Sequence, residues 1–134
     1  SWDVDLIEIE PPILDSPLFN KKGQITGRLR DAEAQTIRWQ RWMKINAQSI
    51  FVPKALKELK RKHAWDDQPQ FYNLSHHMYQ SMLISYRIII GRRKDFGNTG
   101  DEYRINRWEE SGRRFEIVPW DRLLEKVQLL DFAG

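Results

Sequence analysis

The segment LISYRIIIGRR, residues 83–93, constrains the fold more than any other part of this sequence. It carries β-branched residues at Ile84 and at 88–90, and Gly91 then interrupts the run. A continuous apolar run of this kind is typical of a strand that is covered on both faces. We therefore expect a central strand of a sheet, with helices packed against it.

Patterns on either side of this segment alternate between strands and helices. The expected order is strand (2–10), helix (29–46), helix (53–63), strand (83–90), helix (101–111), strand (113–118) and helix (120–130). Residues 64–80 have no clean period and are expected to be irregular. This order predicts an α/β or α+β domain in which a small sheet is flanked by helices.

Chain length and composition narrow the class of protein. With 134 residues, the chain is expected to form a single domain, residues 1–134, and its start at Ser1 predicts a fragment of a longer protein. It has no cysteine, which excludes disulfides and cysteine-based metal sites and favours an intracellular setting. No apolar run approaches the roughly 18 residues of a membrane helix. We expect a soluble, cytoplasmic protein that does not contact a membrane.

Glu8 and Glu10 lie two residues apart in the first expected strand. Side chains alternate between the faces of a strand, so both carboxylates project from the same face and repel one another. A divalent cation that prefers hard oxygen ligands, such as Mg²⁺, Mn²⁺ or Ca²⁺, would compensate them. An exposed edge or pairing with arginines would compensate them equally well, and the spacing alone leaves both interpretations open.

Gln35 is the polar member of an otherwise apolar helical arc. At 100° per residue, the helix 29–46 places it among apolar side chains, while basic residues fall on the other side. The apolar set is Leu29, Ala32, Trp39, Trp42 and Met43, and the basic set is Arg30, Arg38, Arg41 and Lys44. Gln35 therefore points toward the core or toward a site at the edge of the core. His76 and His77 are adjacent and point apart, which makes them a poor metal pair.

Basic residues cluster in three places, although the net charge of +3 is modest. The clusters lie at 54–62, at Arg92, Arg93 and Lys94 directly after the central strand, and at 113–114. Such clusters are often only a solvated face. Arginines at a strand end beside a metal site would instead form a phosphate-binding surface.

Five segments in this order are similar to one known family. They are IEIEPP, LFNKKGQ, LRDAEAQTIRWQRWMKIN, RIIIGRR and FEIVPWDRLLEKV. The chain resembles the Shedu family, a C-terminal nuclease-like domain of bacterial anti-phage defence proteins. The resemblance implies a restriction-endonuclease-like PD-(D/E)xK fold, with a mixed sheet flanked by helices. It also implies a homo-oligomer in the full-length protein.

The resemblance assigns roles to individual residues. The family's catalytic strand motif falls on Glu8, Ile9 and Glu10, and its helix glutamine falls on Gln35. It implies that DNA phosphodiester bonds are hydrolysed with Mg²⁺ or Mn²⁺, which Glu8, Glu10 and the Ile9 carbonyl would bind. Gln35 would orient water or contact the DNA backbone.

Two departures from the family pattern leave a second hypothesis open. Glu10 stands where the motif usually has lysine, and a carboxylate there can act as a general base or a second metal ligand. The motif aspartate of an earlier strand is not evident in this sequence. It lies upstream of Ser1, or else the domain is a non-catalytic nucleic-acid-binding or assembly module. On either hypothesis, Arg92, Arg93, Lys94, Arg38 and Arg41 are the candidate DNA contacts; a protein-interaction domain built around the tryptophans is a third possibility.

Overall fold

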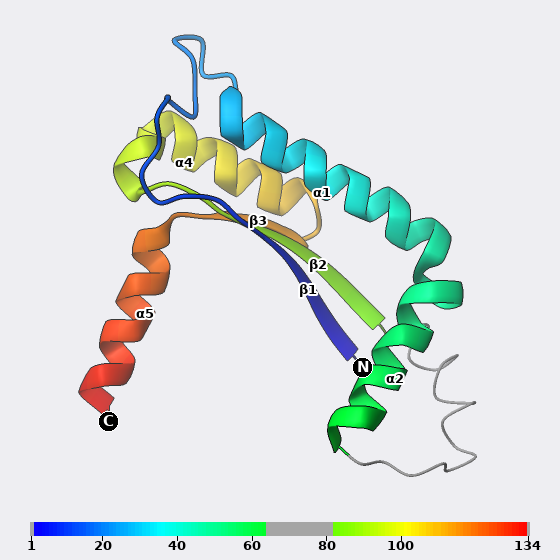
Figure 1. Ribbon diagram of the computed structural model, residues 1–134. Helices are drawn as coiled ribbons and strands as arrows, with labels where there is room; N and C mark the ends of the chain where they lie inside the picture. The colour runs from blue at the N-terminus through cyan, green and yellow to red at the C-terminus, as the bar shows by residue number, and fades with distance from the viewer. Residues whose placement is uncertain (1, 64–81, 134) are drawn as a thin grey trace. The chain divides into compact units, whose positions relative to one another are not determined.

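The computed structural model describes residues 2–63 and 82–133 of the chain, and it contains both helices and strands (Figure 1). In chain order these are β1 (Trp2–Ile9), α1 (Gly27–Asn46), the π-helical segment η1 (Ala47–Phe51), α2 (Val52–His63), β2 (Met82–Ile89), α4 (Arg93–Glu110), β3 (Phe115–Val118) and α5 (Trp120–Ala133). The expected order of strands and helices is thus confirmed for these residues, whereas the segment 64–80 lies outside them. Within the same residues, no helix is long and apolar enough to cross a membrane.

The described strands form one sheet in the order β1-β2-β3, which makes β2 the central strand. β2 and β3 are parallel, with Tyr86 opposite Phe115 and Ile88 opposite Ile117. This architecture confirms the α/β class. In the described residues the sheet is parallel throughout rather than mixed, because helices lie between β1 and β2 and between β2 and β3, and each such crossover returns the chain to the same end.

α4 and the start of α1 lie on the same face of the sheet (Figure 1). Right-handed crossovers that add strands in one direction place their helices on one side, which accounts for this arrangement. α4 packs on β3, and the Arg107 guanidinium lies 4.8 Å from the centre of the Phe115 ring. The core between helices and sheet is apolar and almost inaccessible: Leu29, Ala32, Ile88, Ile90 and Ile117.

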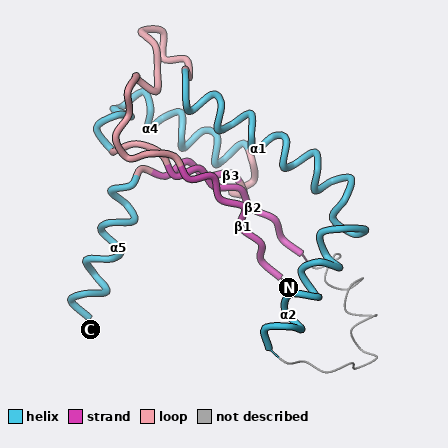
Figure 2. The backbone as a smooth tube through the Cα atoms, in the orientation of Figure 1, coloured by secondary structure: helices cyan, strands magenta, loops and turns pink. Residues whose placement is uncertain are grey.

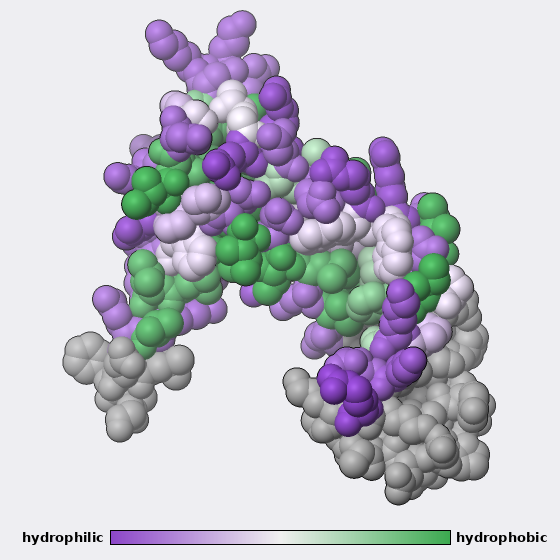
Figure 3. Space-filling model, viewed as in Figure 1, coloured by the Kyte–Doolittle hydropathy of each residue, from purple (hydrophilic) through white to green (hydrophobic). Residues whose placement is uncertain are grey.

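The opposite face of the sheet is open at β1. Ile7 and Ile9 are 41% and 64% exposed, whereas the alternate positions Leu6 and Glu8 are half-buried. Two-sided covering thus does not extend to β1, because both crossover helices pass on the other side. Figure 3 shows hydrophobic surface here and on α5, where Leu124 and Val127 are exposed.

A loop from Glu10 to Thr26 joins β1 to α1 and runs beside α4 (Figure 2). Leu18 in this loop is buried, and the Phe19 ring packs edge to face on Phe96 and Tyr103, with centroids 6.1 and 5.7 Å away. Gly100 makes this approach possible, since a Cβ at that position would lie 2.8 Å from the Phe19 ring. The loop is thus part of the packed structure.

The chain divides into two compact units, Ser1–Val4 with Ile37–Ile84 and Asp5–Thr36 with Ser85–Gly134. In the first unit η1 and α2 pack together, and Trp42 lies edge to face with Phe51 at 6.5 Å. The second unit contains the carboxyl ends of the strands together with α4 and α5. Glu8, Glu10 and Gln35 all belong to this second unit. The sequence-based expectation of a single domain stays a prediction.

Candidate functional site

Hydrogen bonds join the carboxyl ends of the three strands to one another. The backbone N–H of Glu10 donates to the Ile89 carbonyl at 2.8 Å, and that of Gly91 donates to the Pro11 carbonyl at 3.0 Å. The backbone N–H of Trp120 donates to the Gly91 carbonyl at 2.9 Å, and its indole N–H donates to the Glu10 carbonyl at 2.7 Å. The segments that follow β1, β2 and β3 therefore meet at one edge, the position where parallel sheets commonly form their sites.

Gly91 makes the turn from β2 into α4. Its φ of +61° lies in the left-handed region, and a Cβ there would meet Leu14 at 3.0 Å and the Asp95 carboxylate at 3.1 Å. Asp95 accepts a hydrogen bond of 2.7 Å from the backbone N–H of Arg92, which fixes the start of the helix. This turn holds the arginines after β2 at the same edge as Glu10.

Arg28, in the first turn of α1, holds the Glu10 side chain. Its Nη1 donates to Oε2 of Glu10 at 3.2 Å, and its Nε lies 3.5 Å from the Asp15 carboxylate. The Glu10 side chain is 19% exposed, so the charge is partly withdrawn from water and needs a cation nearby. Arg28 supplies that cation. Pairing with an arginine is one of the two interpretations that the spacing of Glu8 and Glu10 left open. The sequence did not single out Arg28.

Glu8 and Gln35 are both half-buried and belong to the same unit as Glu10. Glu8 projects from the same face of β1 as Glu10, because the two are separated by one residue. Both Glu8 and Gln35 interact with other groups of the protein. Ile9 lies between the acids with an exposed side chain, on the open face. The structure therefore agrees with the expected facing of Glu8 and Glu10, and it places Gln35 in the same compact unit.

Arg92, the first residue expected to contact phosphate, is held by Asp121 at the start of α5. Nε of Arg92 donates to Oδ1 of Asp121 at 2.6 Å, and the backbone N–H of Arg93 donates to the same oxygen at 3.1 Å. The hydrogen bond from the Arg92 guanidinium lowers the pKa of Asp121 to about 2, and the Arg93 N–H contributes in the same direction. This pair ties the ends of β2 and β3 together.

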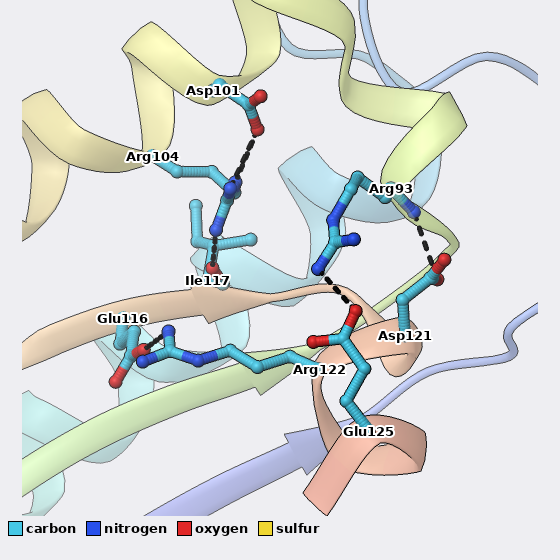
Figure 4. A network of polar contacts seen from close by, with 8 residues as sticks. All are labelled: Arg93, Asp101, Arg104, Glu116, Ile117, Asp121, Arg122 and Glu125. Carbon is cyan, nitrogen blue, oxygen red and sulfur yellow. Dashed lines mark hydrogen bonds and ion pairs between the residues drawn. The ribbon is translucent and has the colours of Figure 1, made fainter.

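Arg93 and Lys94 continue the basic cluster at the start of α4. Nη2 of Arg93 lies 2.8 Å from the Glu125 carboxylate, one turn further along α5 than Asp121 (Figure 4). The Arg93 side chain is 57% exposed and Lys94 is exposed, so this pair is in contact with solvent. Exposed ion pairs contribute little to stability, and an incoming phosphate can compete for such an arginine.

Arg38 and Arg41 belong to the other compact unit. Both are exposed on α1, and Arg38 makes an interaction with another group of the protein. The expected basic helix, α2, likewise carries exposed Lys54 and Lys57. Their role as DNA contacts stays a prediction that is separate from the edge of the sheet. His76 and His77 lie outside the described residues.

A buried polar cluster behind the sheet was not anticipated from the sequence. Glu33 on α1 is only 7% exposed, and Oε1 accepts hydrogen bonds from the Tyr103 hydroxyl at 2.8 Å and from Nε of Arg107 at 3.3 Å. Burial raises the pKa of the Tyr103 hydroxyl, and its hydrogen bond to Glu33 raises that pKa further. The sequence does contain a signal for the burial of Glu33. It is four residues after Leu29, which is buried, and the two share a face of the helix.

The donor set for a metal consists of the Glu8 and Glu10 carboxylates and the Ile9 carbonyl. No group of three or more His, Cys, Asp or Glu side chains arranged for a metal occurs in the described part of the chain. Mg²⁺ is commonly held by one or two carboxylates with water completing its shell, so two acids are compatible with it. The ion pair with Arg28 uses one oxygen of Glu10, which makes Arg28 a competitor for any cation at this position.

The comparisons with known proteins give no relative for this chain: no protein-family model, no curated protein and no solved structure matches it.

Proposed function

We propose that the chain is a Shedu-like nuclease domain with a restriction-endonuclease-like fold, which hydrolyses DNA phosphodiester bonds with Mg²⁺ or Mn²⁺. The observation that supports this proposal best is the meeting of acidic and basic groups at the carboxyl edge of the sheet. Glu10 follows β1 and Arg92 follows β2, and hydrogen bonds through Gly91 and Trp120 connect the two segments. A phosphodiester needs both kinds of group, one for the reaction and one for the backbone charge.

Each residue has a role in this proposal. Glu8 and Glu10 would hold the metal, which when bound lowers the pKa of water and neutralises charge on the phosphate. Gln35 would orient the attacking water or contact the DNA backbone. Arg92, Arg93 and Lys94 would bind phosphates of the DNA on the same edge. In the cell, we propose, the protein acts as a cytoplasmic homo-oligomer in defence against phage.

Cleavage of supercoiled plasmid tests the proposal directly. The protein should nick or linearise plasmid with Mg²⁺ or Mn²⁺ and not with EDTA, and Glu8→Gln should abolish this activity. If Glu10 is the general base, Glu10→Gln should lower the rate by about 10²–10⁴-fold. Asp31→Asn is the matched control, because Asp31 is an exposed acid on α1. Absence of cleavage by the wild type with every divalent metal would rule out the nuclease.

A second candidate, a nucleic-acid-binding module without catalysis, is favoured by the ion pair between Arg28 and Glu10. A permanent cation at Glu10 replaces the metal in neutralising the acid. Such a module should bind DNA without cleaving it. Its affinity should fall steeply with salt, because each phosphate contact releases counterions. Binding that does not respond to salt would exclude this alternative.

A further inference from the structure

A small basic pocket of about 80 Å³ lies on the open face of the sheet, opposite the face that carries Glu8 and Glu10. Its lining residues come from β2, β3 and α5: Arg87, Glu116, Val118, Arg122, Leu123 and Lys126. Three cations thus surround a single carboxylate. The ion pair between Arg87 and Asp5 shows on which face of the sheet the pocket lies. Asp5 and Glu8 are three residues apart on β1, so their side chains project from opposite faces, and Arg87 is on the face of Asp5.

The carboxylate in this pocket is shared between two arginines. Nη1 of Arg122 donates a hydrogen bond to the Glu116 carboxylate, and Figure 4 shows Arg122 extending from α5 along β3 to reach it. Nη2 of Arg87 lies 3.6 Å from the same carboxylate, and its Nη1 lies 4.0 Å from Asp5. Both distances exceed those of a hydrogen bond. One negative charge on Glu116 therefore serves two guanidinium groups, while Lys126 adds a third positive charge.

Arg87 carries an unsatisfied hydrogen-bond donor in this pocket. Its Nε is buried and has no hydrogen-bond acceptor. A buried donor without an acceptor costs free energy. The Arg87 guanidinium has five N–H donors in all, and its two terminal nitrogens make only the long contacts to Glu116 and Asp5. A phosphate group offers several oxygens to the terminal N–H groups of an arginine, which in Arg87 have only those long contacts. The pocket is thus suited to an anion rich in oxygen.

A larger and more apolar pocket of about 200 Å³ adjoins it at the outer edge of β3. The two pockets share Glu116 and Arg122, and the second is also lined by Arg104, Ile105, Trp108 and Ile117. Arg104 bridges Asp101 and the Ile117 carbonyl at 2.7 and 3.2 Å, which fixes it at this edge (Figure 4). Trp108 and Ile105 give the pocket an aromatic and an aliphatic wall.

We propose that these two adjoining pockets bind a nucleotide, with the phosphate at Arg87, Arg122 and Lys126 and the base against Trp108 and Ile105. Aromatic side chains stack on any nucleobase, while guanidinium and ammonium groups bind its phosphate. The proposal goes beyond nuclease activity, since this site lies at the outer edge of β3 and on the open face beside it, and uses none of the residues assigned to cleavage.

Calorimetric titration with three probes tests both halves of the site. AMP should bind more tightly than inorganic phosphate and more tightly than adenosine, because only AMP fills both pockets. Lys126→Glu, on the exposed surface of α5, should weaken the binding of AMP by about tenfold or more, since it reverses a charge beside the phosphate. Lys21→Glu, an equal charge reversal on the exposed loop after β1, should leave AMP affinity unchanged. Equal effects of the two reversals would overturn the proposal.

The apolar half has its own variants. Trp108→Leu and Ile105→Ala should weaken AMP and leave phosphate affinity unchanged, and Ile105 is 53% exposed, so its truncation leaves the core intact. Unchanged AMP affinity in both folded variants would exclude a base at this position. Displacement of AMP by a single-stranded oligonucleotide would assign the phosphate to a nucleic-acid strand, and no displacement would assign it to a free nucleotide. The Glu8→Gln variant should still bind AMP, so the nucleotide site and the nuclease activity can be rejected independently of one another.

Discussion

Nη1 of Arg28, at the start of α1, donates a hydrogen bond of 3.2 Å to the Glu10 carboxylate at the end of β1. The same guanidinium also approaches Asp15 in the loop between them. The arginine therefore occupies one oxygen, Oε2, of the Glu10 carboxylate. In the proposed nuclease, the ion pair competes with the metal.

Removal of Arg28 should strengthen metal binding in the proposed nuclease. Arg28→Gln deletes the competing cation, and we expect Mn²⁺ to bind several-fold more tightly, as measured by calorimetry or by the EPR signal of free Mn²⁺. The double variant Arg28→Gln with Glu10→Gln should lose the gain. Asp15→Asn is the matched control, because Asp15 is 77% exposed and its loss leaves the bond to Glu10 in place. Unchanged Mn²⁺ affinity in Arg28→Gln would show that Glu10 is not a metal ligand.

The buried carboxylate of Glu33 should matter for stability rather than for activity. Glu33→Gln keeps the shape of the side chain but leaves Arg107 without its carboxylate partner and weakens the bond from Tyr103. We expect the free energy of unfolding to fall by about 1–3 kcal/mol in urea titrations. Glu102→Gln, at an exposed position of the same helix pair, should change it little. A loss no larger than that of the control would mean that the cluster contributes nothing.

Gly100 should not tolerate even a methyl group. In a helix, replacement of glycine by alanine normally gains about 1 kcal/mol. Here the new Cβ would lie 2.8 Å from both the Phe19 ring and Cβ of Phe96, and overpacking of this kind costs about 1–3 kcal/mol. We therefore expect Gly100→Ala to lower the midpoint of urea unfolding. Asn106→Ala, on the exposed side of α4, is the control and should raise it or leave it unchanged.

The sequence predicted the elements of this fold because their signals are local. The apolar run at 88–90 identifies the central strand, and the period of two places Glu8 and Glu10 on one face. The open face of β1 was not predictable in this way. Whether Ile7 is covered depends on the side on which the crossover helices pass, and no property of residues 2–10 records that choice.

The partners of the candidate site residues could not be predicted from the sequence either. Arg28 is 18 positions from Glu10, and Asp121 is 29 positions from Arg92, so neither pair has a sequence spacing that would indicate contact. The basic residues after β2 are adjacent in the sequence, and their role as DNA contacts stays a prediction. Their acidic partners come from α5, and only the return of β3 to the same edge of the sheet brings that helix close.

The ion pair between Asp121 and Arg92 should make part of the stability depend on pH. The pKa of Asp121 is about 2 in the folded protein, against 3.8 for the ordinary group. Because the folded value is the lower one, the stabilisation is complete above about pH 5 and is lost as the pH falls from about 4 to about 2. In urea titrations between about pH 6 and pH 2.5, the difference in unfolding free energy between wild type and Asp121→Asn should therefore shrink on acidification. Asp31→Asn, an exposed acid on α1, should show no such convergence, and a difference that stays constant for Asp121→Asn would contradict the assigned pair.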